Sequence, residues 1–500
     1  MGSPLFAKKP LKLLLEEAES DNRLRRILGK WQLTGLGVGA IIGAGIFVAT
    51  GAAAHDRAGP ALMMSYVAAG ITCVFAALCY AEFASMVPVA GSAFTYAYAT
   101  MGEMFAWIIG WDLVLEYAVG SATVANSWSS YFQTLLPKMG IHLPAALSAA
   151  PVKYVSDVGF QSTGAYINLP AVLITIVVTA VLVKGIQESA RFNATMVLVK
   201  LAAVLFVIGV GAFFVNADNW HPFAPYGWGG VSFFGDPKLT WGEFIGGKPV
   251  GVLAGAAIVF FAYIGFDSVS THAEEAKNPK KDVPFGIITS LLVCTVLYIL
   301  VVAVLTGMVK YDQIDKGAGV SSAFNTVGLG WAEVIIATAG VAGITSVLLV
   351  MMLSAPRVFL AMSRDGLLPQ SFFADVHPKF RTPWKTTILV GVVVAAGAGL
   401  LPLDALLDMT NIGTLFAFSI VCTAVLIMRR VNPAADRPFR CPMVPLVPIL
   451  GIGCCLVLML SLPVENWYRL VGWLLIGLLI YFLYGRHHSV MAKQRAEGKV

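Results

Sequence analysis

The chain has 500 residues, of which 58% are hydrophobic and only 12% are charged, and its mean hydropathy is +0.78. Soluble domains carry roughly 25% charged residues, so this composition excludes a soluble protein and predicts an all-α integral membrane protein. The net charge of +6 does not predict a nucleic-acid partner, because in a membrane protein the placement of Lys and Arg between the spans matters more than their sum.

The chain begins with a charged segment and continues as a series of apolar runs. Residues 1–30 contain no apolar run bounded by a cleavage site, so we predict a cytoplasmic N-terminal segment and no cleaved signal peptide. Because a transmembrane helix needs about 20 apolar residues, we predict about twelve transmembrane helices, followed by a cytoplasmic tail over residues 486–500. The predicted spans are 31–52, 61–82, 102–132, 167–184, 192–215, 249–271, 285–309, 331–355, 384–402, 405–428, 443–462 and 466–485.

Lysine and arginine are distributed unevenly between the predicted loops. If the N-terminus is cytoplasmic, most of the 34 basic residues lie in cytoplasmic segments. The outer loops and the outer ends of the spans then hold only Arg57, Lys138, Lys153, Lys238, Lys248, Lys310, Lys316 and Arg469. Basic segments resist translocation, so this asymmetry predicts an even number of spans, both termini in the cytoplasm and a multi-pass protein of the plasma membrane.

The first and sixth spans are interrupted by glycine. The first span carries glycines that a continuous helix tolerates poorly, at Gly35, Gly37, Gly39, Gly43 and Gly45, and residues 255–267 of the sixth span form a comparable stretch. Interruptions five spans apart predict two inverted five-helix repeats, residues 31–215 and 249–428, whose broken helices meet near the bilayer midplane. Residues 443–485 form two additional predicted helices outside the repeat.

The two interruptions are complementary to a zwitterion. Unwinding exposes amide N–H groups at the positive end of the second half of span 1, which suits a carboxylate, and it exposes carbonyl oxygens that suit an ammonium group. We predict that the amides of Ala44, Gly45 and Ile46 hold the carboxylate, that the carbonyls of Ala40, Ile41, Phe260, Phe261 and Ile264 hold the amine, and that Gly43 and Tyr263 complete the site. The alternative is that the glycines only allow close helix packing, but packing does not explain their recurrence at equivalent places.

Lys200 is the only basic residue in the interior of a predicted span, away from its ends, where a cation costs at least about 2.5 kcal/mol. Loss of hydration favours the neutral amine, so we predict that Lys200 gains and loses a proton and ties span 5 to carbonyl groups of span 1. Snorkelling to an interface is the alternative. However, about eight residues, or about 12 Å of helix, separate Lys200 from the start of its span.

Other polar residues lie near the predicted site. Glu116 lies deep in span 3 and is a candidate either to bind a cationic substrate side chain or to make a helix-packing hydrogen bond. Asp112 lies one turn earlier on the same face, where we expect it to approach a solvated interface. Ser321, Ser322 and Asn325 precede span 8. Their polarity favours an ordinary outer loop, and the alternative is that they cap the substrate cavity.

No cofactor or metal site is predicted, since the seven cysteines have no CxxC or Cys/His spacing and there is no ATPase motif. An integral membrane enzyme would need a catalytic cluster, but the histidines all lie in loops or near span ends. A channel would need a continuous polar pore. The charged residues after span 6 are interpreted as a solvated cytoplasmic loop, with a gating salt bridge as the alternative: Glu274, Glu275, Lys277, Lys280 and Lys281.

Four ordered stretches carry a family resemblance. They are Gly39-Ala-Ile-Ile-Gly43-Ala-Gly45-Ile-Phe47; Tyr80-Ala-Glu82 through Pro88-Val-Ala-Gly91-Ser92 to Gly110-Trp111; Phe260-Phe-Ala-Tyr-Ile-Gly265-Phe266-Asp267 through Glu274-Glu275 and Asn278-Pro279 to Pro284; and Pro356-Arg357 through Met362-Ser-Arg364-Asp365-Gly366-Leu367. Together they resemble the amino acid-polyamine-organocation transporter superfamily and, within it, the cationic amino acid transporter family. The resemblance implies a five-plus-five inverted repeat, alternating access, and an α-amino acid bound between spans 1 and 6. It also places Lys200 where sodium-coupled relatives hold an ion, which implies proton coupling.

The sequence therefore predicts a secondary active L-amino acid transporter driven by proton symport. Its predicted partners are the amino acid, protons and membrane lipids, with no cofactor. Glu116 favours a cationic substrate, whereas Ile41, Phe260 and Phe261 suit a small neutral side chain equally well. The alternatives are an amino acid exchanger and a polyamine or organocation carrier.

Overall fold

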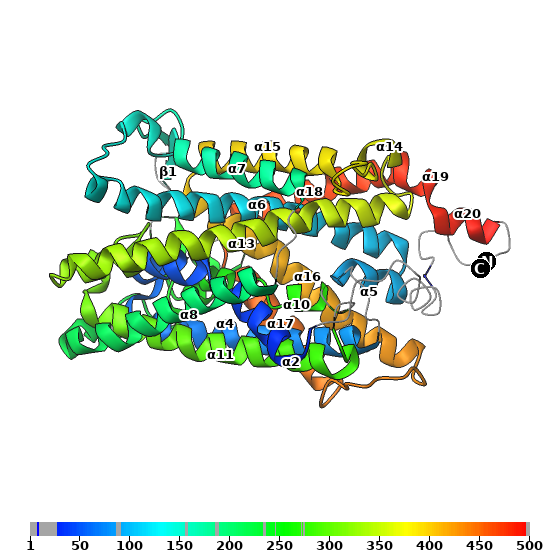
Figure 1. The fold of residues 1–500 in the computed structure, drawn as a ribbon. Coiled ribbons are helices and arrows are strands. Elements are labelled where there is room, and N and C mark those ends of the chain that lie inside the picture. The colour runs from blue at the N-terminus through cyan, green and yellow to red at the C-terminus, as the bar shows by residue number, and fades with distance from the viewer. Residues whose placement is uncertain are drawn as a thin grey trace.

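The computed structural model describes residues 8–9, 28–86, 92–155, 159–185, 190–233, 237–245, 247–271, 273 and 276–496. Its regular structure is almost entirely helical, and the long helices run side by side from one end of Figure 1 to the other. The helices are α2 (Lys30–Ile41), α3 (Thr50–Ala53), α4 (Leu62–Met86), α5 (Ser92–Thr100), α6 (Glu103–Leu135), α7 (Leu169–Lys184), α8 (Ala190–Gly211), α9 (Val252–Val259), α10 (Ser268–Thr271), α11 (Pro279–Met308), α12 (Gly319–Thr326), α13 (Gly330–Arg364), α14 (Gln370–Phe373), α15 (Trp384–Leu400), α16 (Leu403–Val431), α17 (Leu446–Leu460), α18 (Val464–Ile480), α19 (Arg486–His488) and α20 (Val490–Ala496).

The lengths of these helices fit a membrane protein. Seven helical segments of the described chain are long and apolar enough to cross a membrane: Gly45–Met86, Glu103–Met139, Thr195–Phe214, Pro279–Met308, Gly330–Arg364, Leu403–Val431 and Val464–Gln494. Four shorter apolar segments of 10–17 residues cover other predicted spans: Leu169–Lys184, Val252–Tyr263, Trp384–Leu400 and Leu446–Leu460. The all-α membrane fold is confirmed. Helix α13 continues past the predicted end of span 8 at residue 355, to Arg364.

The first and sixth spans are broken, as predicted. Helix α2 ends at Ile41, the backbone at Ile42 is extended, and a π-helical turn begins at Gly45. Helix α9 ends at Val259 and continues as a tight 3₁₀ turn over Phe260–Tyr263. Gly265 then has a φ of +121°, a backbone conformation that favours glycine because a Cβ atom is strained there. Both interruptions therefore leave peptide groups outside regular helical hydrogen bonding.

Among the described residues, three short antiparallel hairpins lie in loops between helices, where no strand was predicted. Strand β1 (Val152–Val155) pairs with β2 (Gly159–Ser162) between α6 and α7. The other two hairpins lie between α8 and α9 and consist of β3 (Val231–Ser232) with β4 (Thr240–Trp241) and β5 (Glu243–Ile245) with β6 (Lys248–Val250). They were missed because hydropathy locates spans and carries little information on two- to four-residue strands.

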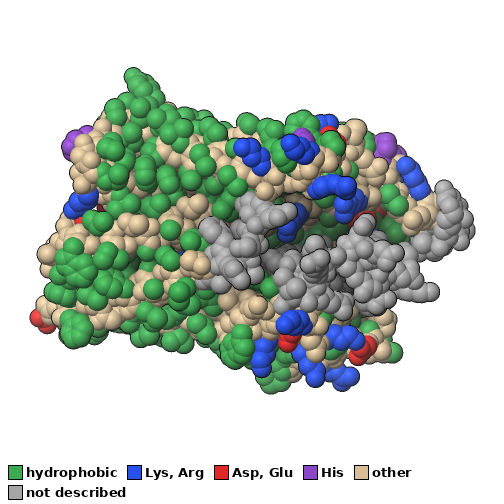
Figure 2. All heavy atoms as spheres, viewed as in Figure 1, with side chains coloured by type: hydrophobic (Ala, Val, Ile, Leu, Met, Phe, Trp, Pro, Cys, Tyr) green, Lys and Arg blue, Asp and Glu red, His purple; other side chains and the backbone are tan. Residues whose placement is uncertain are grey.

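Both ends of the described chain lie on the same side of the bundle. The ammonium of Lys9 is 3.3 Å from a carboxylate oxygen of Asp365, which directly follows α13, and the amide of Val490 donates to the Asp365 carbonyl at 3.0 Å. An even number of crossings is needed to bring both ends to one side. Most of the Lys and Arg side chains visible in Figure 2 lie toward this end, and hydrophobic side chains cover much of the remaining face.

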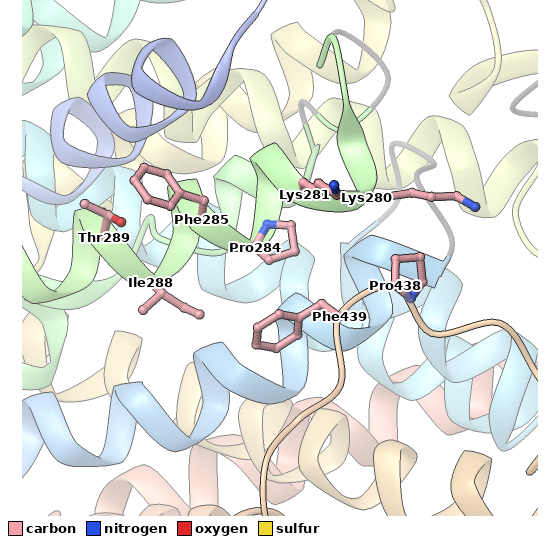
Figure 3. A pocket seen from close by; sticks show the side chains of 8 residues that line it. All are labelled: Lys280, Lys281, Pro284, Phe285, Ile288, Thr289, Pro438 and Phe439. Atoms are coloured by element: carbon pink, nitrogen blue, oxygen red, sulfur yellow. The ribbon is translucent and has the colours of Figure 1, made fainter.

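At the same end, a hollow of about 340 Å³ opens beside the start of α11. Its wall is formed by the first turns of α11 and by Pro438 and Phe439 of the segment that follows α16 (Figure 3). The hollow is lined mainly by apolar side chains, with Lys280 and Lys281 at one end.

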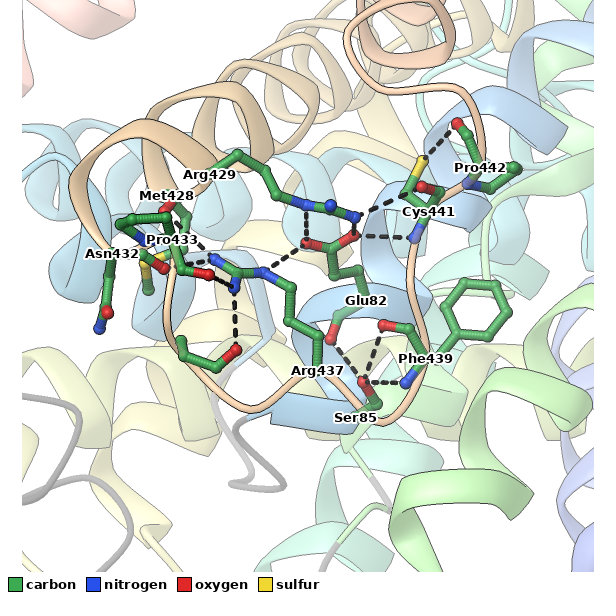
Figure 4. Close-up of polar contacts among 11 residues, drawn as sticks. Glu82, Ser85, Met428, Arg429, Asn432, Pro433, Arg437, Phe439, Cys441 and Pro442 are labelled. Carbon is green, nitrogen blue, oxygen red and sulfur yellow. Dashed lines mark hydrogen bonds and ion pairs between the residues drawn. The ribbon is translucent and has the colours of Figure 1, made fainter.

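A buried carboxylate fixes the segment that follows α16. The carboxylate of Glu82, near the end of α4, accepts two hydrogen bonds from the Arg429 guanidinium, at 2.9 and 2.8 Å, and one from the Arg437 guanidinium, at 3.2 Å. The amide of Cys441 also donates to it at 2.8 Å. Figure 4 shows both arginines directed at this one carboxylate. Because removing one partner of a buried ion pair typically costs about 3–5 kcal/mol, this cluster holds α4 and α16 firmly together.

The opposite end of α16 carries a second ion cluster. Asp408 lies 3.3 Å from the ammonium of Lys248 in β6 and 4.0 Å from the guanidinium of Arg57. Arg57 also donates to the Pro249 carbonyl at 2.8 Å. One helix, α16, therefore makes ion pairs at both of its ends.

Candidate functional site

The interruptions of spans 1 and 6 face each other inside the bundle. A Cβ atom added to Gly45 would collide with the backbone of Ala262, and one added to Gly265 would come within 2.8 Å of the Ala40 carbonyl oxygen. Backbone from the two spans therefore approaches more closely than any side chain would permit. The residues predicted to bind both ends of an amino acid lie together in the structure.

The amides predicted to bind a carboxylate lie at the start of a helical turn. Ala44 precedes the turn and Gly45 and Ile46 open it, and the first amides of a helix have no intrahelical acceptor. The amide of Phe47, by contrast, already donates to the Gly43 carbonyl at 3.3 Å. All of these residues are buried. The local geometry is that of an anion site made of backbone groups.

Several of the predicted carbonyl acceptors already receive hydrogen bonds. The hydroxyl of Tyr298 in α11 lies 2.8 Å from the carbonyl oxygen of Ile41 and 3.1 Å from that of Ala262. The Phe261 carbonyl accepts from the amide of Ile264 at 3.3 Å. A carbonyl oxygen has two lone pairs, so these bonds orient the acceptors and leave capacity for an ammonium group. Tyr298 joins the two broken segments.

Lys200 reaches the first break from α8. Its side chain is 1% exposed, and its ammonium donates to the Gly39 carbonyl at 2.5 Å. The lysine stem also lies against Gly343 of α13, where an added Cβ would come within 3.1 Å of it. The predicted tie between span 5 and the carbonyls of span 1 is present in the structure. Snorkelling of Lys200 to an interface is excluded by its burial.

Three carboxylates gather beside the second break. Glu116 is 3% exposed and interacts electrostatically with Asp267 and Asp112. Thr414 of α16 lies within hydrogen-bonding reach of Glu116, and Tyr117 within reach of Asp267. Among the described residues, the Oε2 atom of Glu116 has no hydrogen-bond partner. The cluster is suited to a cationic group or to protons.

The expectation that Asp112 approaches solvent is wrong. Its side chain is completely buried against Gly413 of α16, and neither carboxylate oxygen has a hydrogen-bond partner in the described part of the chain. The error arose because Asp112 was placed by its distance from the end of an apolar run. Helix α16, which covers it, lies about 300 residues away in the sequence, and helices distant in sequence pack together freely in a membrane bundle.

Two other predicted residues have different surroundings from those expected. Tyr263 directs its hydroxyl at the Tyr66 carbonyl, 2.8 Å away, and so braces α4. The interpretation of Ser321 as part of a polar loop is wrong, because it lies completely buried in the short helix α12. Ser321 is beside Tyr131, whose hydroxyl donates to the Phe47 carbonyl at 2.7 Å.

The remaining predicted residues are buried and apolar. Gly43 lies against Val347 of α13, and an added Cβ would come within 2.6 Å of that side chain. Phe260 packs edge to face on Phe418 of α16, with ring centroids 5.6 Å apart. Glu274 and Glu275, considered for a gating salt bridge, lie outside the described residues.

Sequence reasoning missed three polar residues at this site. Tyr298 and Asp267 are described above, and Asn411 of α16 donates to the Ile258 carbonyl at 3.2 Å while its own carbonyl oxygen is buried without a partner among the described residues. Polar side chains inside apolar spans were the available signal. In the described part of the chain, no three His, Cys, Asp or Glu side chains are arranged to hold a metal ion.

Comparison with known proteins covers both breaks and Lys200. A family model described as amino acid permease matches residues 28–484. The methylthioribose transporter of Bacillus subtilis (strain 168) is 46% identical over 98% of this chain and 100% of its own length. The branched-chain amino acid permease BcaP of the same organism is 47% identical over 98% and 99%, and the vacuolar cationic amino acid transporter 4 of Arabidopsis thaliana is 30% identical over 98% and 97%.

Proposed function

The chain belongs to the amino acid permease family, and we propose that it is a proton symporter that carries an L-α-amino acid across the plasma membrane by alternating access. Its family and relatives are transporters and not enzymes. In this proposal both termini are cytoplasmic, which agrees with the excess of Lys and Arg on that side. The two inverted repeats, 31–215 and 249–428, provide the moving parts.

The observation that carries the proposal is the close approach of the two broken helices. Amides at the start of the Gly45 turn favour a carboxylate through their unpaired N–H groups and the positive end of the helix dipole. Carbonyls around Ile41 and Phe260, where the two helices end, favour an ammonium group. A site made of backbone recognises the part that all α-amino acids share and leaves side-chain selection to other residues.

Proton coupling is assigned to Lys200. The ammonium form donates to Gly39 in the last turn before the break, so protonation of Lys200 stabilises one arrangement of span 1. Deprotonation weakens that bond, because a neutral amine is a poorer hydrogen-bond donor than an ammonium group, and so lets the first half of the span move. Binding of the amino acid and of the proton are then coupled through one flexible segment, and such coupling is reciprocal.

The preferred substrate side chain is proposed to be cationic, because the carboxyl groups of Glu116 and Asp267 lie close to each other beside the second break. A neutral branched side chain is the second candidate. It is supported by the apolar packing of Phe260 and Val347 around the site and by the similarity to a permease whose name specifies branched-chain amino acids.

A ligand screen followed by transport tests the function. The purified protein is screened against the twenty amino acids and methylthioribose, and its melting temperature should rise in the presence of its substrate. At a ligand concentration of a hundred times the dissociation constant, the free energy of unfolding should increase by about 2.7 kcal/mol. The ligand found should then enter empty liposomes faster when the outside is acidic. Uptake that requires amino acid inside the liposomes would indicate an exchanger, and stabilisation by methylthioribose alone would contradict the proposed substrate class.

Glu116→Gln separates the two substrate candidates. If Glu116 binds a cationic side chain, the substitution should weaken arginine binding about tenfold or more, because hydrogen bonds to charged groups contribute about 1.5–3 kcal/mol, and should leave leucine binding nearly unchanged. Isothermal titration of both ligands measures the ratio. The matched control is Glu333→Gln, a buried glutamate whose partner is Lys138 at 3.1 Å. Equal weakening of arginine and leucine would make Glu116 a packing residue.

A further inference from the structure

The hollow beside the start of α11 has the composition of a lipid site. Pro284, Phe285, Ile288 and Phe439 give it an apolar wall. In Figure 3, Lys280 and Lys281 lie at one end, whereas Ile288 and Thr289 lie at the other, further along the helix. A charged end and an apolar end in one elongated hollow match an amphipathic ligand.

The positive charge at the hollow is greater than its two lysines. Lys280 and Lys281 occupy the first turn of a 30-residue helix, where the helix dipole is already positive. Lys30 adds a third cation, with its ammonium 5.3 Å from the ring centre of Phe285. Such crowding of positive charge is unfavourable unless an anion offsets it.

The acidic residues nearby do not offset this charge. Asp436 lies 3.2 Å from Lys280, but the two side chains are 79% and 58% exposed, and exposed ion pairs contribute little. Asp282 accepts from the amide of Asn278 at 3.2 Å and so caps the helix. An exposed pair of this kind leaves the Lys280 ammonium accessible to a ligand.

The neighbouring surface fits a membrane interface. Trp31 is 65% exposed and meets Phe285 edge to face, with ring centroids 5.2 Å apart, as aromatic side chains do at the headgroup level. Basic pockets between transmembrane helices on the cytoplasmic side attract anionic headgroups.

We propose that this hollow binds one anionic phospholipid, with its phosphate between Lys280 and Lys281 and an acyl chain along Phe285 and Ile288. The bound lipid contacts both α11 and the segment after α16, because residues of both line the hollow. Phe439 of that segment is in turn connected to α4, since its backbone exchanges hydrogen bonds of 3.2 and 3.5 Å with the Ser85 hydroxyl. The lipid thereby supports the segment that the Glu82 cluster holds. This site is independent of the substrate and of the proposed transport mechanism.

Native mass spectrometry of the full-length protein in detergent tests the proposal. Phosphatidylglycerol and phosphatidylcholine with identical acyl chains are added in equal amounts. The wild type should retain one phosphatidylglycerol in preference to phosphatidylcholine. The double substitution Lys280→Gln with Lys281→Gln should weaken phosphatidylglycerol retention about 25-fold, since each basic residue near an anionic surface contributes about 1 kcal/mol.

Two further variants distinguish the hollow from general attraction. Lys184→Gln with Lys379→Gln removes two exposed lysines at the same end of the molecule and should leave retention unchanged. Thr289→Trp fills the apolar end without changing charge and should displace the lipid. Equal losses in both double variants, full retention in Thr289→Trp, or occupancy by glycerol 3-phosphate in place of the lipid would each overturn the proposal. Melting temperatures measured without lipid identify any variant that fails to fold, and Thr289→Trp then tests the site with both lysines intact.

Discussion

Replacing Lys200 with alanine should leave amino acid binding measurable while uptake into liposomes no longer accelerates when the outside is made acidic. The wild-type ammonium is 1% exposed and bonds to Gly39 in the last turn before the first break. Placing a cation inside the membrane costs at least about 2.5 kcal/mol. Removing the Lys200 ammonium should therefore reduce gradient-driven uptake about tenfold or more. Initial uptake rates with and without an imposed pH gradient measure the effect.

Lys200→Arg is the matched control for charge and length. Arginine keeps hydrogen-bond donors near Gly39, but it does not lose its proton in proteins. It should therefore preserve the contact with span 1 and still abolish the response to the gradient. Substrate-dependent melting shifts establish that both variants remain folded and able to bind. Undiminished gradient-driven uptake in Lys200→Ala would remove Lys200 from the coupling mechanism.

Gly45→Ala should also abolish uptake, and for a steric reason. The added methyl group would collide with the backbone of Ala262, which cannot move as the end of a flexible side chain can. Overpacking of this kind costs about 1–3 kcal/mol, and it would separate the two broken segments that we propose hold the substrate. We expect uptake and substrate-dependent stabilisation both to decrease about tenfold or more.

Gly35→Ala provides a control in the same span. Among the described residues outside its own helical turn, no atom lies within 4 Å of a Cβ placed at Gly35. Alanine also favours a helix over glycine by about 1 kcal/mol. This variant should transport normally and melt at an equal or higher temperature. Normal uptake by Gly45→Ala would mean that the contact with Ala262 is not needed for substrate binding.

The breaks in spans 1 and 6 could be predicted from the sequence because their cause is local. Glycine lowers helix stability at its own position, so the density of glycine near Gly43 and the residues around Gly265 indicated the interruption directly. Lys200 was also identifiable, since its burial follows from an apolar run on either side. The membership of the amino acid-polyamine-organocation superfamily, inferred from four short stretches, is confirmed by the family match.

Other features depend on contacts that no local pattern records. Glu82 was noted only as part of a motif, yet it anchors two arginines about 350 residues away. Asp112 was misplaced because helix α16 covers it. Ser321 was assigned to a loop since its short helix is polar on one face and depends on neighbours for burial. In each case the deciding partner is distant in the sequence.

The ion pairs at the two ends of α16 connect this helix to α4 at one end of the bundle and to β6 at the other. Under the proposed alternating access, we expect one of these ion clusters to separate while the other stays intact. The Glu82 cluster has contacts of 2.8 to 3.2 Å with two arginines and a backbone amide. The Asp408 cluster has longer contacts, of 3.3 Å with Lys248 and 4.0 Å with Arg57. Because its contacts are longer, we expect the Asp408 cluster to require less free energy to separate than the Glu82 cluster.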